Sequence, residues 1–179
     1  VYETPLGTVT SMRDPAPSGL RRFNEVTVVA GNTTGQGLSV TIGDSTQRFE
    51  AGENLVRAVF SVPDSSESVS INVSGTADIY GVLMDTKNGV AVDNIPMRGC
   101  SGTIFTAMNA DQLRTFYEEE NVRLIFLQYG GNSVPVIKNA SQVSKYCATI
   151  RKQINYIQGL APKAKIVFMG PSDMGRRTW

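Results

Sequence analysis

The period of the hydrophobic pattern changes near residue 90, and this change limits the fold more than any other feature of the sequence. Apolar and polar residues alternate over Glu25–Asp85, most clearly in Val69–Val73. Turns are predicted about every ten residues, where turn residues interrupt the alternation, as at Gly31-Asn32, Gly43-Asp44, Pro63–Ser66 and Ser74-Gly75. A period of two with this spacing is typical of strands with one buried face, so residues 1–89 are expected to form an antiparallel, jelly-roll-like β-sandwich domain.

The second half of the chain alternates between strand and helix patterns. Val122–Leu127 and Lys165–Met169 are short apolar runs, as expected of strands covered on both faces of a sheet. Between them, apolar residues recur every three or four positions over Ser141–Gln158, which predicts a long amphipathic helix ending near Gly159. A shorter helix is expected over Asn109–Glu120, with Asn109 as its N-cap.

A further strand is expected at Val90–Val92, after a hairpin turn at Asn88-Gly89. The resulting order of strand, helix, strand, helix and strand predicts a partial flavodoxin-like parallel sheet with right-handed crossovers. The sequence therefore predicts an α/β protein with two domains, a β-sandwich over residues 1–89 and a partial α/β domain over residues 90–179.

The composition excludes several classes of site. The chain has 179 residues and no histidine, so it cannot by itself form a Ser-His or Cys-His catalytic pair or an HExxH zinc site. A net charge of +1 provides no field for nucleic acid. Cys100 and Cys147 are too few for a zinc site and are expected to be free in a core, a disulfide being open only in an oxidising compartment. No cofactor is expected, and no apolar run is long enough to span a membrane.

Polar, glycine-rich loops follow each of the three strands predicted for the second half. They cover residues 93–102, 128–133 and 170–174. In an open parallel sheet, ligands bind at the carboxyl ends of the strands. These loops are therefore the expected location of a site.

Two motifs in these loops resemble sequence blocks of the SGNH (GDSL-type) hydrolases, a family of serine esterases. Asn94 and Gly99 keep the five-residue spacing of the second block, and Gly130-Gly131-Asn132 matches the third block. The resemblance extends over Val90–Trp179, about half of the chain. It implies that the Gly99 N–H and the Asn132 amide form an oxyanion hole, in which neutral donors stabilise the charge of a tetrahedral intermediate.

The roles of four other polar residues have two interpretations each. Gly43-Asp44-Ser45 spells the nucleophile block of the same family, but a β pattern resumes at Gln47, which favours a turn between two strands over a nucleophilic Ser45. Asn94, Arg98 and Asp173 either contact the substrate or act as loop and surface residues.

The Asp-x-x-His block of the family is absent, since Met174, Gly175 and Arg176 follow Asp173. The resemblance then implies an internal piece of an exported esterase that deacetylates carbohydrate or peptidoglycan, with a β-sandwich inserted before the second block. The nucleophile and the histidine would lie in the remainder of the parent chain, and this chain alone would be inactive. The alternative is a non-catalytic carbohydrate-binding or surface β-sandwich module with a degenerate α/β half.

Overall fold

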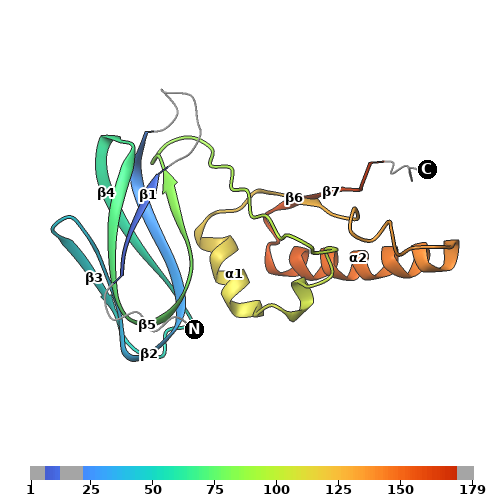
Figure 1. The fold of residues 1–179 in the computed structure, drawn as a ribbon, viewed down its shortest axis with the longest axis horizontal. Helices are drawn as coiled ribbons and strands as arrows, with labels where there is room; N and C mark the ends of the chain where they lie inside the picture. The colour runs from blue at the N-terminus through green and yellow to red at the C-terminus, as the bar shows by residue number, and fades with distance from the viewer. Residues whose placement is uncertain (1–6, 13–21, 173–179) are drawn as a thin grey trace, which may run out of the picture. The chain divides into compact units, whose positions relative to one another are not determined.

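The computed structural model describes residues 7–12 and 22–172 of the chain (Figure 1). The chain divides into two compact units, Val1–Asp93 and Asn94–Trp179. The described elements of the first unit are all β-strands, whereas the second unit combines two α-helices with a pair of parallel strands. The predicted mixture of α and β structure is therefore confirmed.

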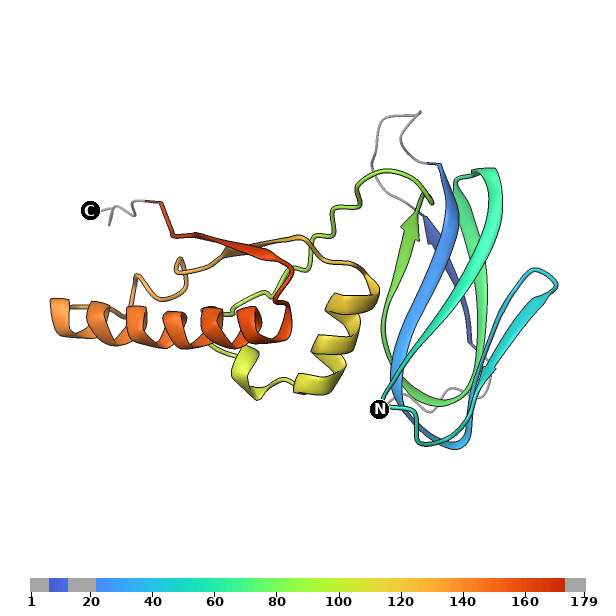
Figure 2. The same cartoon turned by 180° about the vertical axis from the view of Figure 1, so that it is seen from behind.

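The described residues of the first unit form five strands in one hydrogen-bonded antiparallel sheet. The strands are β1 (Gly7–Met12), β2 (Phe23–Ile42), β3 (Ser45–Phe49), β4 (Leu55–Ser66) and β5 (Ser68–Asp85). β2 has 20 residues and pairs with β5 along one edge. Along its other edge, β4 pairs with the first half of β2 and β3 pairs with the second half, as Figure 2 shows from behind.

The core of the first unit follows from the alternation in the sequence. On β2, for example, the side chains of Val26, Val28 and Ala30 point to the same face and are at most 1% exposed. Strands β4 and β5 add to the same cluster, since their apolar residues also alternate with polar ones. The buried members are Phe23, Val26, Val28, Ala30, Leu38, Val40, Val56, Ala58, Phe60, Val69 and Ile71.

The predicted turns of the first unit have mixed outcomes. The turn at Gly43-Asp44 is confirmed, since it joins β2 to β3 with φ of 57° at Gly43. The predictions at Gly31-Asn32 and Ser74-Gly75 are wrong because both pairs lie inside long strands, where the register between β2 and β5 shifts. Pro63–Ser66 also lies within a strand, and the chain turns only at Glu67. The pairing of β4 is irregular there, which accommodates a proline without an N–H group.

The second unit is built on two parallel strands, β6 (Leu124–Gln128) and β7 (Lys165–Met169). The crossover between them contains α2 (Ala140–Leu160), which lies along one face of the strand pair in both views (Figures 1 and 2). Helix α1 (Ala110–Glu119) precedes β6, and the 3₁₀ helix η1 (Phe105–Ala107) precedes α1. The two predicted helices and these two strands are confirmed, although α2 continues through Gly159 to its C-cap Ala161.

Only one face of the β6–β7 pair is covered within the described part of the chain. Leu127 is 6% exposed and packs with Phe105 and Ile157 in the core of the unit. On the opposite face, Phe126 is 60% exposed and Val167 is 40% exposed. Parallel sheets are normally covered on both faces, and no described element of the second unit covers this second face.

The strand predicted at Val90–Val92 is wrong. Residues 86–97 form neither helix nor strand, and Val90 and Val92 are 92% and 89% exposed. Asn88-Gly89 forms a bend, with φ of 128° at Gly89, and makes no hairpin. A strand needs a neighbouring strand for its backbone hydrogen bonds, and within residues 7–12 and 22–172 no strand pairs with this segment.

No helix in the described ranges is both long and apolar enough to cross a membrane.

Candidate functional site

A side-chain hydrogen bond joins the two loops that carry the predicted oxyanion residues. The Nδ2 atom of Asn132 donates to the backbone carbonyl of Cys100 at 3.0 Å. Asn132 lies in the turns that follow β6, and Cys100 directly follows Gly99. The structure therefore brings the amide of Asn132 next to the Gly99-Cys100 backbone.

Gly99 occupies a tight turn that needs glycine for its conformation. Its φ is 76°, in the left-handed region, and the Cys100 N–H closes the turn by donating to the Met97 carbonyl at 3.1 Å. No heavy atom lies within 4 Å of the place where a Cβ would stand, so the conformation and not the space requires glycine. Among the described residues, none accepts a hydrogen bond from the Gly99 N–H.

The loop after β6 also packs against the loop after β7. Gly130 has φ of 118°, and a Cβ at this position would come within 2.5 Å of the Pro171 Cδ atom. The Gly130 carbonyl accepts from the N–H of Ser133 at 2.8 Å, and Ser133 is buried. Loops from three parts of the chain therefore meet at the carboxyl end of the strand pair, where a ligand site of a parallel sheet is expected.

Tyr129 holds the loop that carries Gly99. A Cβ at Gly102 would lie 2.6 Å from the Tyr129 Cγ atom, so the ring packs directly on this glycine. The Tyr129 hydroxyl donates to Met97 Sδ at 3.3 Å, and the ring makes an edge-to-face contact with Phe105 at 5.8 Å between centroids. Burial raises the pKa of Tyr129, and the nearby Cys100 raises it further. Tyr129 is therefore a neutral packing residue that positions the loop.

Among the other predicted site residues of the second unit, Asn94 and Arg98 take no part in these contacts. Asn94 and Arg98 are exposed, and within the described part of the chain they make no hydrogen bond or ion pair. Ser45 begins β3 in the first unit and lies opposite Ile42, directly after the Gly43-Asp44 turn. Asp173 lies outside the described residues.

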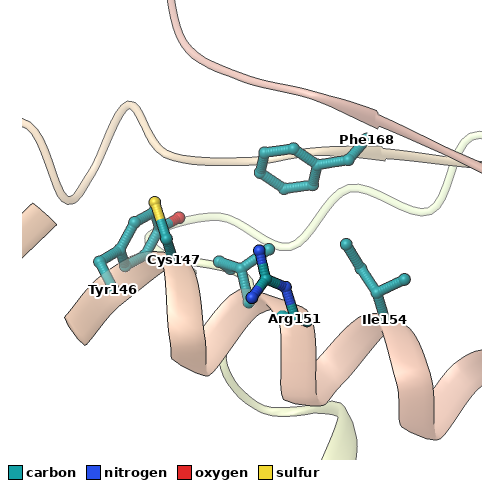
Figure 3. Close-up of a pocket in the computed structure, with 6 residues that line it drawn as sticks. Tyr146, Cys147, Arg151, Ile154 and Phe168 are labelled. Atoms are coloured by element: carbon teal, nitrogen blue, oxygen red, sulfur yellow. The ribbon is translucent and has the colours of Figure 1, made fainter. Parts of the chain in front are cut away.

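A groove in the second unit was not predicted from the sequence. It has a volume of about 230 Å³ and lies between α2 and β7 (Figure 3). Its lining consists of Tyr146, Cys147, Ile150, Arg151, Ile154 and Phe168. The signal in the sequence was the apolar stripe of α2, because Tyr146, Cys147, Ile150 and Ile154 belong to this stripe and line the groove.

Tyr146 connects this groove to the loop that carries Gly99, because its hydroxyl donates to the Ser101 carbonyl at 2.8 Å. Cys147 is exposed and Cys100 is half-buried, and both are free thiols, so the prediction that both pack in a core is wrong for Cys147. Among the residues with described positions, no three His, Cys, Asp or Glu side chains gather as metal ligands.

No family model matches the chain, and no curated protein matches it. Among solved structures, the chain is similar to the crystal structure of protein YxiM from Bacillus subtilis, with 15% sequence identity and a TM-score of 0.23. The match covers 94% of this chain and 55% of that one, so the chain spans about half the length of YxiM.

Proposed function

We propose that the second unit supplies the oxyanion-binding half of the active site of an SGNH-type ester hydrolase. The observation that carries this proposal is the hydrogen bond from Asn132 Nδ2 to the Cys100 carbonyl, 3.0 Å long. It connects the two loops whose motifs resemble the second and third family blocks. In the proposed fold, β6 and β7 belong to a partial flavodoxin-like sheet, and the first unit is a jelly-roll-like sandwich inserted before the second block.

Two neutral donors support the chemistry. A primary amide has two N–H groups, so Asn132 keeps a second hydrogen beside the one that the Cys100 carbonyl accepts. The Gly99 N–H is the other donor, and no described residue accepts a hydrogen bond from it. Fixed donors of this kind stabilise the negative oxygen of a tetrahedral ester intermediate and need no titratable group.

In this proposal the histidine lies outside residues 1–179, because the chain contains none, and the nucleophilic serine is also assigned to the remainder of the parent chain. In the proposed reaction, a serine attacks the ester carbonyl while a histidine accepts its proton and passes it to the leaving alcohol. Water then hydrolyses the acyl-enzyme by the same route. By the family resemblance, the substrate is an acylated carbohydrate or peptidoglycan outside the cytoplasm, and this chain alone is inactive.

The proposal is tested by Asn132→Ala in the parent enzyme that contains the nucleophile, with p-nitrophenyl acetate as substrate. We expect kcat to fall by about 10²–10³ with little change in Tm, since the lost donor acts on the transition state. Asn155→Ala is the matched control because Asn155 is exposed on α2 and belongs to none of the three loops. An unchanged kcat in Asn132→Ala would remove the oxyanion proposal.

A further inference from the structure

Tyr80 is the extra residue of a β-bulge in the first unit. Gly81 of β5 lies opposite Val29 of β2, and the next pair is Ile79 with Ala30, so Tyr80 has no residue opposite it. A bulge of this kind turns a side chain out of the regular alternation, and bulges are frequent next to binding sites. Here it leaves Tyr80 47% exposed.

Asn32 fixes the position of the Tyr80 ring and of a neighbouring carboxylate. Its Nδ2 atom donates to the Tyr80 hydroxyl at 3.1 Å and to Asp78 Oδ2 at 2.7 Å. Asn32 has φ of 50°, a conformation that non-glycine residues rarely adopt. Gly31 lets the ring approach the strand, because a Cβ there would lie 3.0 Å from Tyr80 Cε2. The ring and the carboxylate are thus ordered before any ligand binds, which lowers the entropy cost of binding.

Thr33 anchors the loop of residues 50–54 next to Asn32 by hydrogen bonds. Its side chain is 2% exposed, and its hydroxyl donates to the Glu50 carbonyl at 2.7 Å and accepts from the Glu53 N–H at 2.8 Å. The Asn32 N–H donates to the Asn54 carbonyl at 3.2 Å. The patch of Asn32, Asp78 and Tyr80, called the Tyr80 patch below, therefore stands on a rigid frame.

We infer that the Tyr80 patch binds neutral carbohydrate. An exposed aromatic ring can stack on the apolar C–H face of a sugar ring, while a carboxylate beside it accepts hydrogen bonds from sugar hydroxyls. An ionised carboxylate has about four acceptor positions, and Asn32 uses one position on Asp78. The negative charge of Asp78 disfavours phosphorylated or uronic-acid ligands. This inference does not depend on the proposed hydrolase activity.

The test is native affinity electrophoresis of the 179-residue chain in gels that contain soluble xylan, galactomannan or polygalacturonate. We expect at least one of the two neutral polysaccharides to retard the chain and polygalacturonate not to retard it. Tyr80→Ala should weaken binding about tenfold, because it removes the stacking surface. Asp78→Ala should weaken it too, by removing the acceptor while it keeps the ring.

Phe126→Ala is the control, because Phe126 is an aromatic residue of the second unit that is 60% exposed and should not affect binding. Circular dichroism of each variant checks that it is folded, and Asp78→Ala provides the test if Tyr80→Ala does not fold. Three results would each overturn the inference: no retardation by xylan or galactomannan, retardation by polygalacturonate alone, or equal binding by the wild type and the folded patch variants.

Discussion

At the scale of single residues, Gly130 determines whether the loops after β6 and β7 can meet. Its φ of 118° and the 2.5 Å approach of Pro171 to its missing Cβ leave no place for a side chain, whereas Gly131 has ordinary φ and no atom within 4 Å. We expect Gly130→Ala to lower the free energy of unfolding by about 1–3 kcal/mol and Gly131→Ala to change it by less than about 0.5 kcal/mol. Urea denaturation followed by circular dichroism measures both, and equal stabilities would contradict this account of the loop contact.

Residues whose role depends on sequence neighbours were predictable, and residues whose role depends on distant partners were not. Asn109 was predicted as an N-cap, and its Oδ1 atom accepts from the N–H groups of Asp111 and Gln112 at 3.0 and 3.1 Å. Tyr80 carries no such local signal, because its exposure comes from a bulge that forms only when β5 pairs with β2. The bond from Asn132 to the Cys100 carbonyl was not predicted: the family resemblance paired Asn132 with Gly99 as oxyanion donors, and that pairing stays a prediction.

At the scale of elements, Gln153 fastens α2 to η1. Its side chain is 3% exposed, its Oε1 accepts from the Thr106 N–H at 2.9 Å and its Nε2 donates to Thr106 Oγ1 at 3.1 Å. Gln153→Leu leaves both Thr106 groups without these partners, so we expect a loss of about 1–3 kcal/mol of stability. Asn155→Leu, at an exposed position of the same helix, is the control. An equal shift of the urea midpoint in both variants would show that the hydrogen bonds between Gln153 and Thr106 do not stabilise the second unit.

Helices and strands with a strong local hydrophobic pattern were predicted correctly, whereas segments whose structure depends on pairing with a distant strand were not. β7 has the predicted bounds, and α2 differs by only one or two residues at each end, since both have strong local hydrophobic patterns. β2 continues through Gly31-Asn32, although such residues usually form turns, because the irregular pairing with β5 keeps them within the strand as bulge residues. Val90–Val92 has the pattern of a strand but no partner strand in the described ranges, and pairing cannot be read from the pattern itself.

At the scale of the whole molecule, the segment between the elements of the two units is continuously exposed and irregular over residues 86–96. Lys87 and Arg98 flank it, and Val90 within it is 92% exposed. We expect trypsin to cut after Lys87 before it cuts any other described position, because a protease needs an exposed chain that it can extend, whereas Arg98 lies in the hydrogen-bonded turn of Gly99. Mass spectrometry of a digestion time course identifies the cuts. The variant Lys87→Gln should lose the early product, and a first cut inside β2–β5 or α1–β7 would contradict the prediction.

The two free thiols belong to the same unit, since Cys100 and Cys147 both follow residue 94. A maleimide dye therefore labels the second unit and leaves the sheet of the first unit unlabelled. Cys147 is exposed on α2 and Cys100 is only half-buried, so brief labelling favours the helix position. The fluorescence of such a dye reports on the groove between α2 and β7, and it provides a signal for the second unit that is separate from the β-sheet circular dichroism of the first.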